Sequence, residues 1–382
     1  MKDVWWAELD SNQRRRKPAD LQSAPVGHFG IDPQMLSFEQ RGVLYGAENE
    51  MSNRVCRGAG ERYARMTIQI EASAIPKRGS MTFTVHAQDL RFPEGPIALA
   101  DGSVLLVEMF RPSLSRVAHD GTVTVVAQIP GGPNGAAIGP DGRVYICNNG
   151  AAFAPVAHAD GGIDVEYSSL TRYCGGSIDI VDLHTGVVQS LFRACDGVPL
   201  RAPNDLVFDD HGGFYFTDLG YPVPGYETGS PIYYATADGS TIRVCIADAS
   251  GPNGIGLSPD GTRLYWAETM NGRLLSATLA SPGVVVSGST HLLYDFPAGD
   301  ALDSLAIDGA GNICVAVLGS GAIGVVSPDG TLLARYPTGD SGTTNICFGG
   351  PDLRTAFVTL GRSGKLVSME WPWPGLPLAY GR

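Results

Sequence analysis

One sequence pattern occurs six times along the chain, and this repetition constrains the fold more than any other feature. Each copy starts with a polar residue after a proline or a similar tight position. An apolar strand follows, then a turn of the Asp-Gly type, then a second strand. The copies begin at Phe92, Gly132, Ala202, Gly251, Ala301 and Thr343. The polar residues, counted from Glu94, are separated by 40, 70, 49, 50 and 42 residues. The shorter intervals match a four-stranded blade of a β-propeller.

The repeats predict an all-β fold, a six-bladed β-propeller with four-stranded blades, formed as one domain by residues 81–382. Residues 82–86 form one more strand, which we expect to complete the last blade and close the ring. The composition agrees, because 50 Gly and 26 Pro among 382 residues make up about a fifth of the chain, against roughly 12% in average usage. A helical bundle would contain far fewer of both and more charge.

Residues 1–80 do not share the repeat, and we interpret them as an N-terminal extension that is disordered or that results from a mis-assigned start. The stretch Glu8–Pro25 resembles spurious translations sometimes annotated across structural-RNA genes. We expect Met81 to be the natural first residue. Peptides from upstream of Met81 in the native protein would contradict this expectation.

Charge and cysteine content exclude several functional classes. The formal net charge is −12, and no basic patch occurs beyond Arg14–Lys17, which argues against nucleic-acid binding. No apolar run approaches the roughly 18 residues that span a bilayer, and no secretory signal is recognisable. The seven cysteines are scattered and never form a CxxC pair, as expected for reduced thiols. We therefore expect a cytoplasmic protein without a membrane or nucleic-acid partner; its oligomeric state stays open.

The repeated polar position predicts a ring of oxygen-bearing side chains. Innermost strands start around the central channel of a propeller, so their first polar residues should share one rim. Asn and Asp also cap turns, but turn capping does not require six of them at one rim. Oxygen ligands without His or Cys select a hard cation. We expect Ca²⁺, with Mg²⁺, Mn²⁺ or Zn²⁺ as substitutes, although Zn²⁺ prefers imidazole or thiolate. The six residues are Glu94, Asn134, Asn204, Asn253, Asp303 and Asn345.

A second set of polar residues follows the first by 14 or 15 positions: Glu108, Asn148, Asp218 and Glu268. Because a hairpin turn lies midway, each should return to the same rim and face the substrate or support the ring; a solvated strand end is the alternative. Two long segments leave this rim and are candidate lids. Residues 149–173 carry His158, Tyr167 and Arg172, and residues 219–231 carry Tyr221 and Tyr226.

The motifs together resemble the SMP-30/gluconolactonase/LRE-like family over nearly all of residues 81–382. They are Phe92-Pro-Glu-Gly-Pro, Arg201-Ala-Pro-Asn-Asp-Leu, the run from Gly251 to Gly261, Leu302-Asp-Ser-Leu-Ala-Ile-Asp and Asn345-Ile-Cys-Phe-Gly-Gly. The resemblance implies one divalent metal in the channel of a six-bladed propeller, with Glu94, Asn253 and Asp303 as ligands. Asn204 matches a substrate-contacting Asn that approaches the metal in some relatives. Arg201 lies three residues before Asn204, whereas the lactone-contacting Arg of some members lies two residues before it.

The resemblance also implies a metal-dependent hydrolase that opens a sugar-acid or related lactone by water attack. Asp303 is the candidate general base. The expected substrate-binding residues are Asn204, Asn134, Arg201, Asp218 and Glu268. Three alternatives remain. One is a phosphotriesterase of the diisopropyl-fluorophosphatase kind, with Asp303 as nucleophile. Another is a non-enzymatic ligand-binding propeller. The last is a strictosidine-synthase-like condensing enzyme, which needs no metal.

Overall fold

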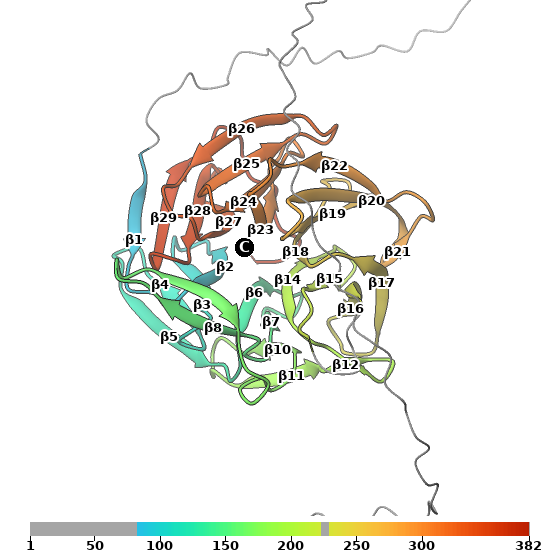
Figure 1. Cartoon of the computed structure of the whole chain (residues 1–382), viewed down its shortest axis with the longest axis horizontal. Coiled ribbons are helices and arrows are strands. Elements are labelled where there is room, and N and C mark those ends of the chain that lie inside the picture. The colour runs from blue at the N-terminus through green and yellow to red at the C-terminus, as the bar shows by residue number, and fades with distance from the viewer. Residues whose placement is uncertain (1–81, 223–228, 382) are drawn as a thin grey trace, which may run out of the picture. The chain divides into compact units, whose positions relative to one another are not determined.

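The computed structural model describes residues 82–222 and 229–381. The chain divides into two units, Met1–Ile68 and Gln69–Arg382, and the described residues all belong to the second. The expectations for residues 1–80 lie outside the described residues. Six antiparallel sheets follow one another around a central axis, as predicted (Figure 1). The fold is a six-bladed β-propeller.

The two inner strands of each blade form a hairpin joined by a short turn. Innermost strands of neighbouring blades contact one another, so all six surround the axis. The innermost strands are β2 (Pro93–Ala98), β6 (Pro133–Ile138), β14 (Pro203–Phe208), β18 (Pro252–Leu257), β23 (Ala301–Ile307) and β27 (Thr343–Gly349). The second strands are β3 (Val104–Glu108), β7 (Val144–Asn148), β15 (Gly213–Asp218), β19 (Arg263–Glu268), β24 (Ile313–Leu318) and β28 (Thr355–Leu360).

The two outer strands complete each sheet. The third strands are β4 (Ser113–Val117), β10 (Ser177–Val181), β16 (Ser230–Thr236), β20 (Arg273–Ser281), β25 (Ala322–Val326) and β29 (Lys365–Glu370). The outermost strands are β5 (Val123–Gln128), β11 (Val188–Phe192), β17 (Ile242–Ala249), β22 (His291–Asp295), β26 (Leu332–Pro337) and β1 (Thr84–Ala87). The remaining short strands are β8 (Phe153–Ala157), β9 (Ile163–Tyr167), β12 (Ala194–Cys195), β13 (Val198–Pro199) and β21 (Val284–Val285).

The first strand of the described chain closes the ring, which confirms the prediction for this segment. β1 pairs with β29 in antiparallel register, with Thr84 opposite Ser368. The last blade therefore combines strands from both ends of the propeller sequence. Because the chain runs from β1 into β2 of the first blade, the pairing of β1 with β29 holds the first and last blades together. Residues 82–222 and 229–381 contain no helix long and apolar enough to cross a membrane.

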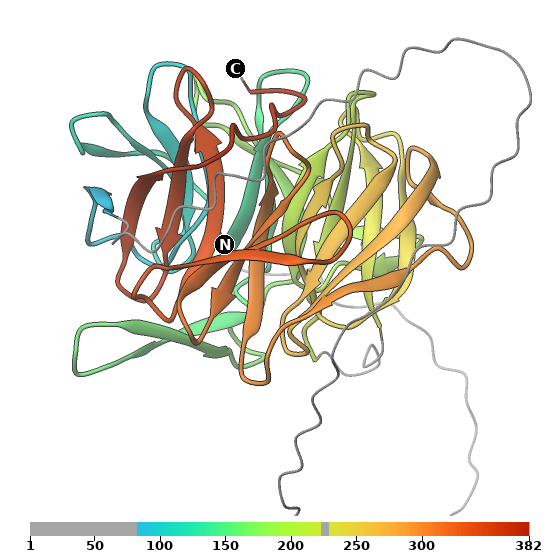
Figure 2. The same cartoon turned by 90° about the horizontal axis from the view of Figure 1, so that it is seen from above.

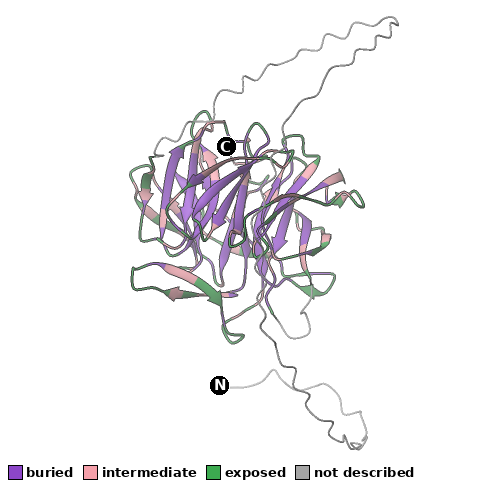
Figure 3. Ribbon diagram, turned by 45° about the horizontal axis from the view of Figure 1, so that its top comes forward, coloured by how far each residue is buried: buried purple, intermediate pink, exposed green. Residues whose placement is uncertain are grey.

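Buried residues are concentrated on the strands inside the propeller (Figure 3), and the hydrophobic core lies between neighbouring blades. Six clusters of buried side chains each join two neighbouring blades, so every pair of neighbours shares one cluster. The cluster between the β14 and β18 blades packs Tyr215 and Tyr234 against Trp266. The six cysteines in the described residues are free. Core packing and strand pairing therefore support the described fold without disulfides.

Every innermost strand has a register shift where it reaches the channel. In β14 the pairing with β15 shifts between Pro203 and Leu206, and in β18 the pairing with β19 shifts between Pro252 and Ile255. Three other innermost strands shift at the corresponding place, and β27 shifts just before it, between Thr343 and Asn345. A β-bulge bends its strand and redirects a side chain. The ring residues therefore sit at or beside irregular positions of the innermost strands.

Glycines beside the ring let innermost strands approach each other closely. A Cβ atom on Gly254 would come within 2.6 Å of the Leu305 nitrogen, and one on Gly135 within 2.6 Å of the Asn204 oxygen. Both contacts are to backbone atoms of the next blade, which cannot move away independently. In contrast, Gly142 of the Asp141-Gly142 turn has φ +76° and nothing within 4 Å. That glycine serves the turn conformation alone.

We expect Gly254→Ala to destabilise the propeller by about 2–3 kcal/mol, because the added methyl group forces two innermost strands apart. Gly142→Ala is the control and should cost only about 1 kcal/mol, from backbone strain. Urea denaturation of both variants measures the difference. Equal losses, or a larger loss for Gly142→Ala, would show that close strand approach is not the limiting factor.

Candidate functional site

The structure brings together all six polar residues that the repeats predict for the ring. Each sits at or beside the register shift of its innermost strand, and each is between 1 and 7% exposed. Asn345 Nδ2 of β27 donates to Glu94 Oε2 of β2 at 3.4 Å, so side chains from the first and last blades meet directly. Asn253 Nδ2 donates to Thr269 Oγ1 at 3.1 Å. Each of these bonds uses the amide nitrogen of the side chain and so fixes the direction of the amide oxygen.

Three amide oxygens of the ring have no hydrogen-bond partner among the described residues. They are the Oδ1 atoms of Asn134, Asn204 and Asn253, all buried. Buried polar atoms are almost always paired, because leaving one unpaired costs roughly 1–3 kcal/mol. Three such atoms on neighbouring strands of one channel indicate that a ligand outside the chain satisfies them. Oxygen atoms of this kind suit Ca²⁺ or another hard cation.

The two ring carboxylates lie in an environment that disfavours negative charge. Burial raises the pKa of Glu94 well above its usual range, and the charges of Asp303 and Asp205 raise it further. Burial also raises the pKa of Asp303, to about 8, against the lowering effect of its hydrogen bond from Asn253. A divalent cation between these groups would balance their charge. Within residues 82–222 and 229–381, no three His, Cys, Asp or Glu side chains form a metal site, so amide oxygens would have to complete the coordination.

Asp205 is a buried carboxylate that the sequence reasoning missed. It follows Asn204 directly, is 6% exposed, and its Oδ1 accepts a hydrogen bond from the Leu206 nitrogen at 2.9 Å. Burial raises its pKa to about 7. A signal was present, because the corresponding residue is glycine in three other repeats, at Gly95, Gly135 and Gly254. Aligning the repeats one residue beyond the ring would have revealed this exception.

The second polar set lies on the predicted rim and binds backbone there. In the β14 blade, Asp218 pairs with Pro203 across the hairpin. Its carboxylate accepts hydrogen bonds from the Arg201 and Ala202 nitrogens, both at 2.8 Å. Three further residues accept from the segment before their own innermost strand in the same way: Glu108 from Arg91, Asn148 from Gly132, and Glu268 from Ser250. Each therefore holds the chain that leads into the ring. Contact of Asp218 and Glu268 with substrate stays a prediction.

Arg201 is held in place by the loops around it. It is 9% exposed, and its guanidinium donates to the Gly229 carbonyl. Tyr173 in turn donates its hydroxyl to the Arg201 carbonyl at 2.6 Å. Its predicted contact with substrate remains untested, but it lies at the rim, in the segment leading to Asn204.

The first candidate lid is a hairpin of strands β8 and β9. Its tip is anchored by Arg362, whose guanidinium nitrogens lie 2.7 Å from carboxylate oxygens of Asp160 and Asp164. His158 also lies 2.6 Å from Asp164. Arg362 belongs to the β27 blade and the hairpin to the β6 blade, which flank the β2 blade on opposite sides. The hairpin therefore spans the rim of the β2 blade (Figure 1).

Aromatic rings connect the base of this hairpin to the second candidate lid. Tyr167 stacks on Phe153 with ring centroids 5.4 Å apart, and Tyr173 stacks on Tyr221 at 4.3 Å. Tyr221 also donates its hydroxyl to the Ser168 carbonyl. Arg172 is exposed. Residues 223–228, including Tyr226, lie outside the described residues.

The family pattern described as "SMP-30/Gluconolactonase/LRE-like region" matches residues 92–362. This span contains all six ring residues. The chain belongs to the SMP-30/gluconolactonase/LRE-like family. The resemblance that the sequence motifs indicated is therefore confirmed.

Two staphylococcal proteins named lactonase drp35 are similar in sequence to this chain. The Staphylococcus aureus (strain MRSA252) protein is 30% identical over 250 residues, which cover 62% of this chain and 65% of that protein. The chain thus spans slightly less than two thirds of that relative's length. The Staphylococcus haemolyticus protein is 29% identical over 258 residues, covering 64% of this chain and 68% of that protein.

Similar solved structures share the fold. A gluconolactonase from Xanthomonas campestris superposes with a TM-score of 0.62 at 22% identity, covering 76% of this chain and 90% of that one. The calcium-binding protein regucalcin from Agrobacterium tumefaciens has the same TM-score at 23% identity, covering 78% and 98%. At this level of identity the two structures support the propeller alone.

We expect the stability of the protein in chelator to fall as pH rises from about 4 to about 8. Burial raises the pKa of Asp303 to about 8, whereas an unfolded Asp titrates near 3.9. Between these values the folded state binds more protons than the unfolded state, so each rise in pH favours unfolding. Asp303→Asn removes this contribution and should flatten the pH dependence.

Urea denaturation in chelator at several pH values measures this effect, with Asp120→Asn as the control because Asp120 is in an exposed turn. If wild type and Asp303→Asn lost stability equally across this window, Asp303 would not be the buried titrating group.

Proposed function

We propose that the protein is a divalent-cation-dependent hydrolase that opens the ring of a small lactone. The observation that carries this proposal is the ring itself, where two buried carboxylates lie with three unpartnered amide oxygens. Membership of the family supports it, as do relatives named lactonase and a similar structure named gluconolactonase. The proposed location is the cytoplasm.

The residues present fit a cation of the calcium type. Glu94 and Asp303 would supply charge, and Asn253 and Asn204 would supply amide oxygens that otherwise lack partners. A regucalcin with the same fold is described as calcium-binding. The donor set contains oxygen alone, which favours Ca²⁺ over Zn²⁺; Mg²⁺ and Mn²⁺ are expected to substitute less well. When bound, the cation would polarise the lactone carbonyl and stabilise the oxyanion that forms.

Asp303 is the proposed general base. One of its carboxylate oxygens accepts a proton from the attacking water, whose oxygen then bonds to the carbonyl carbon. The ring C–O bond breaks, its oxygen takes up a proton, and the product is a hydroxy acid. Asn204 orients the water or the carbonyl, and Asn134 accepts a hydrogen bond from a substrate hydroxyl. Arg201 donates to substrate oxygens at the rim, where Asp218 and Glu268 border the entrance.

Glu94→Gln should weaken calcium binding by a factor of a hundred or more, because it removes one of two charges from a buried site. Glu370→Gln is the matched control, since Glu370 is exposed at the end of β29. Calorimetric titration of chelator-treated protein measures affinity and stoichiometry. Wild type should bind one calcium ion per chain and regain lactonase activity with it. Full activity in excess chelator would contradict the proposed cation dependence.

Asp303→Asn should lower kcat for gluconolactone at least a hundredfold, even at calcium concentrations that saturate the variant. Retained turnover with bound calcium would disprove its role as base. The same preparations, assayed with a phosphotriester, distinguish the two hydrolase hypotheses: a lactonase should favour the lactone in kcat/KM. Asp120→Asn again serves as the control.

A further inference from the structure

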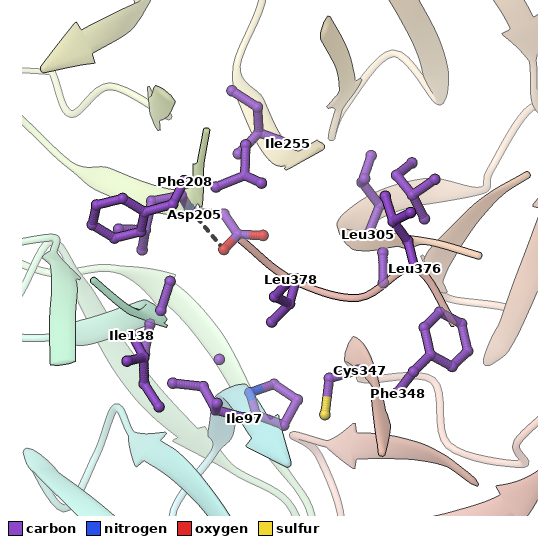
Figure 4. A pocket seen from close by; sticks show the side chains of 18 of the residues that line it. Ile97, Ile138, Asp205, Phe208, Ile255, Leu305, Cys347, Phe348, Leu376 and Leu378 are labelled. Atoms are coloured by element: carbon purple, nitrogen blue, oxygen red, sulfur yellow. Dashed lines mark hydrogen bonds between the residues drawn. The ribbon is translucent and has the colours of Figure 1, made fainter. Parts of the chain in front are cut away.

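The end of the channel away from the ring contains an apolar cavity of about 150 Å³ (Figure 4). Its wall comes from the innermost strands of all six blades, at positions beyond the ring residues except for Asn345, which also lines the cavity. A segment of residues 376–380 runs across this end. Figure 2 shows the C-terminal end of the chain on one face of the propeller and the β8–β9 hairpin on the opposite face. The blades contribute Ile97, Ile138, Phe208, Ile255, Leu305 and Phe348.

Asp205 is the one charged residue among the described residues that line this cavity. Figure 4 shows its carboxylate pointing inward from β14, with the bond from the Leu206 nitrogen on one oxygen. No Lys, Arg or His occurs in the described part of the wall. The carboxylate accepts a hydrogen bond from the Leu206 nitrogen but meets no cationic side chain in the described wall. A buried carboxylate is costly without positive or donating groups around it, so a cationic group in the cavity would stabilise its charge.

The segment of residues 376–380 over the cavity has contacts at both of its ends and is loosely packed at its centre. The Leu376 nitrogen donates to the Ile307 carbonyl at 3.0 Å, and Tyr380 meets Phe208 edge-on with ring centroids 5.6 Å apart. Between these contacts, Leu378 lines the cavity yet remains 56% exposed. A small molecule could therefore enter beside Leu378 without unfolding a blade.

We propose that this cavity is a second binding site, which takes a small apolar molecule that carries a protonated amine. An apolar cavity of this volume holds a group about the size of benzene. The ammonium would donate to Asp205, while the apolar body would fill the space between the six blades. A metal ion would find too few oxygens in this wall. A wholly apolar molecule would leave the carboxylate without a cationic partner. The inference does not depend on the proposed hydrolysis.

Calorimetric titration of the full, calcium-saturated chain with benzylammonium tests the proposal, with benzyl alcohol as a neutral probe of the same shape. Saturating calcium keeps the ring carboxylates occupied. We expect one benzylammonium per chain and at least tenfold weaker binding of benzyl alcohol. Asp205→Asn should weaken benzylammonium binding at least tenfold, and Asp120→Asn should leave it unchanged. Leu378→Trp should weaken both probes by filling the cavity.

The proposal is overturned if wild type binds no benzylammonium at millimolar concentrations, or if Asp205→Asn binds it as tightly as wild type. It is also overturned if benzylammonium competes with calcium or with a lactone substrate, because the probe would then occupy the ring. Unfolding temperature and calcium stoichiometry show whether each variant is folded. If Asp205→Asn does not fold, Leu378→Trp decides, and undiminished binding of both probes to it refutes the site.

Discussion

The register shift at the inner end of every blade is the constraint on which the ring depends. A regular antiparallel pair would hold Asn204 and its counterparts in the ladder, with side chains alternating between the two faces of each blade. The bulge interrupts that alternation at or beside each ring residue and directs its side chain to the channel. Glycines such as Gly254 then let neighbouring innermost strands approach until side chains of different blades meet. The bond from Asn345 to Glu94 is a direct result.

This arrangement places groups where the protein alone cannot satisfy them. Three amide oxygens are removed from water without a donor, and two carboxylates are buried without a cationic partner among the described residues, which opposes folding. The six apolar clusters between blades and the pairing of β1 with β29 stabilise the fold and offset this cost. Local conflict of this kind is typical of functional sites. Glu94 and Asp303 lie in different blades, so ligand binding between them would also connect parts of the ring distant in sequence.

The blades and the ring could be predicted from the sequence because both follow the repeat. Strand, turn and polar position recur together in each repeat, and β1 supplies the fourth strand of the last blade. The bulges could not be predicted, since the innermost strands are short and buried on both faces, so they show no alternation of apolar and polar residues that a register shift would interrupt. The bond between the hairpin tip and Arg362 joins residues about 200 positions apart, and a single such contact produces no periodic signal. Asp205 cannot be predicted from the repeat for the opposite reason: it departs from the repeat, whereas the ring residues follow it.

The two ends of the channel differ because each innermost strand changes character along its length. Its first residues are polar and irregular, and its later residues are apolar and regularly paired, as Asn253 and Ile255 show in β18. Six copies of one strand therefore produce an oxygen-lined rim at one end and an apolar chamber at the other. Asp205, one residue beyond Asn204 of the ring, is a charged exception to this change from polar to apolar residues. Its charge acts on Glu94 and Asp303 above it and also faces the apolar chamber below. A change at this single position would thus alter the electrostatics of both ends, whereas changes at Leu378 reach only the chamber.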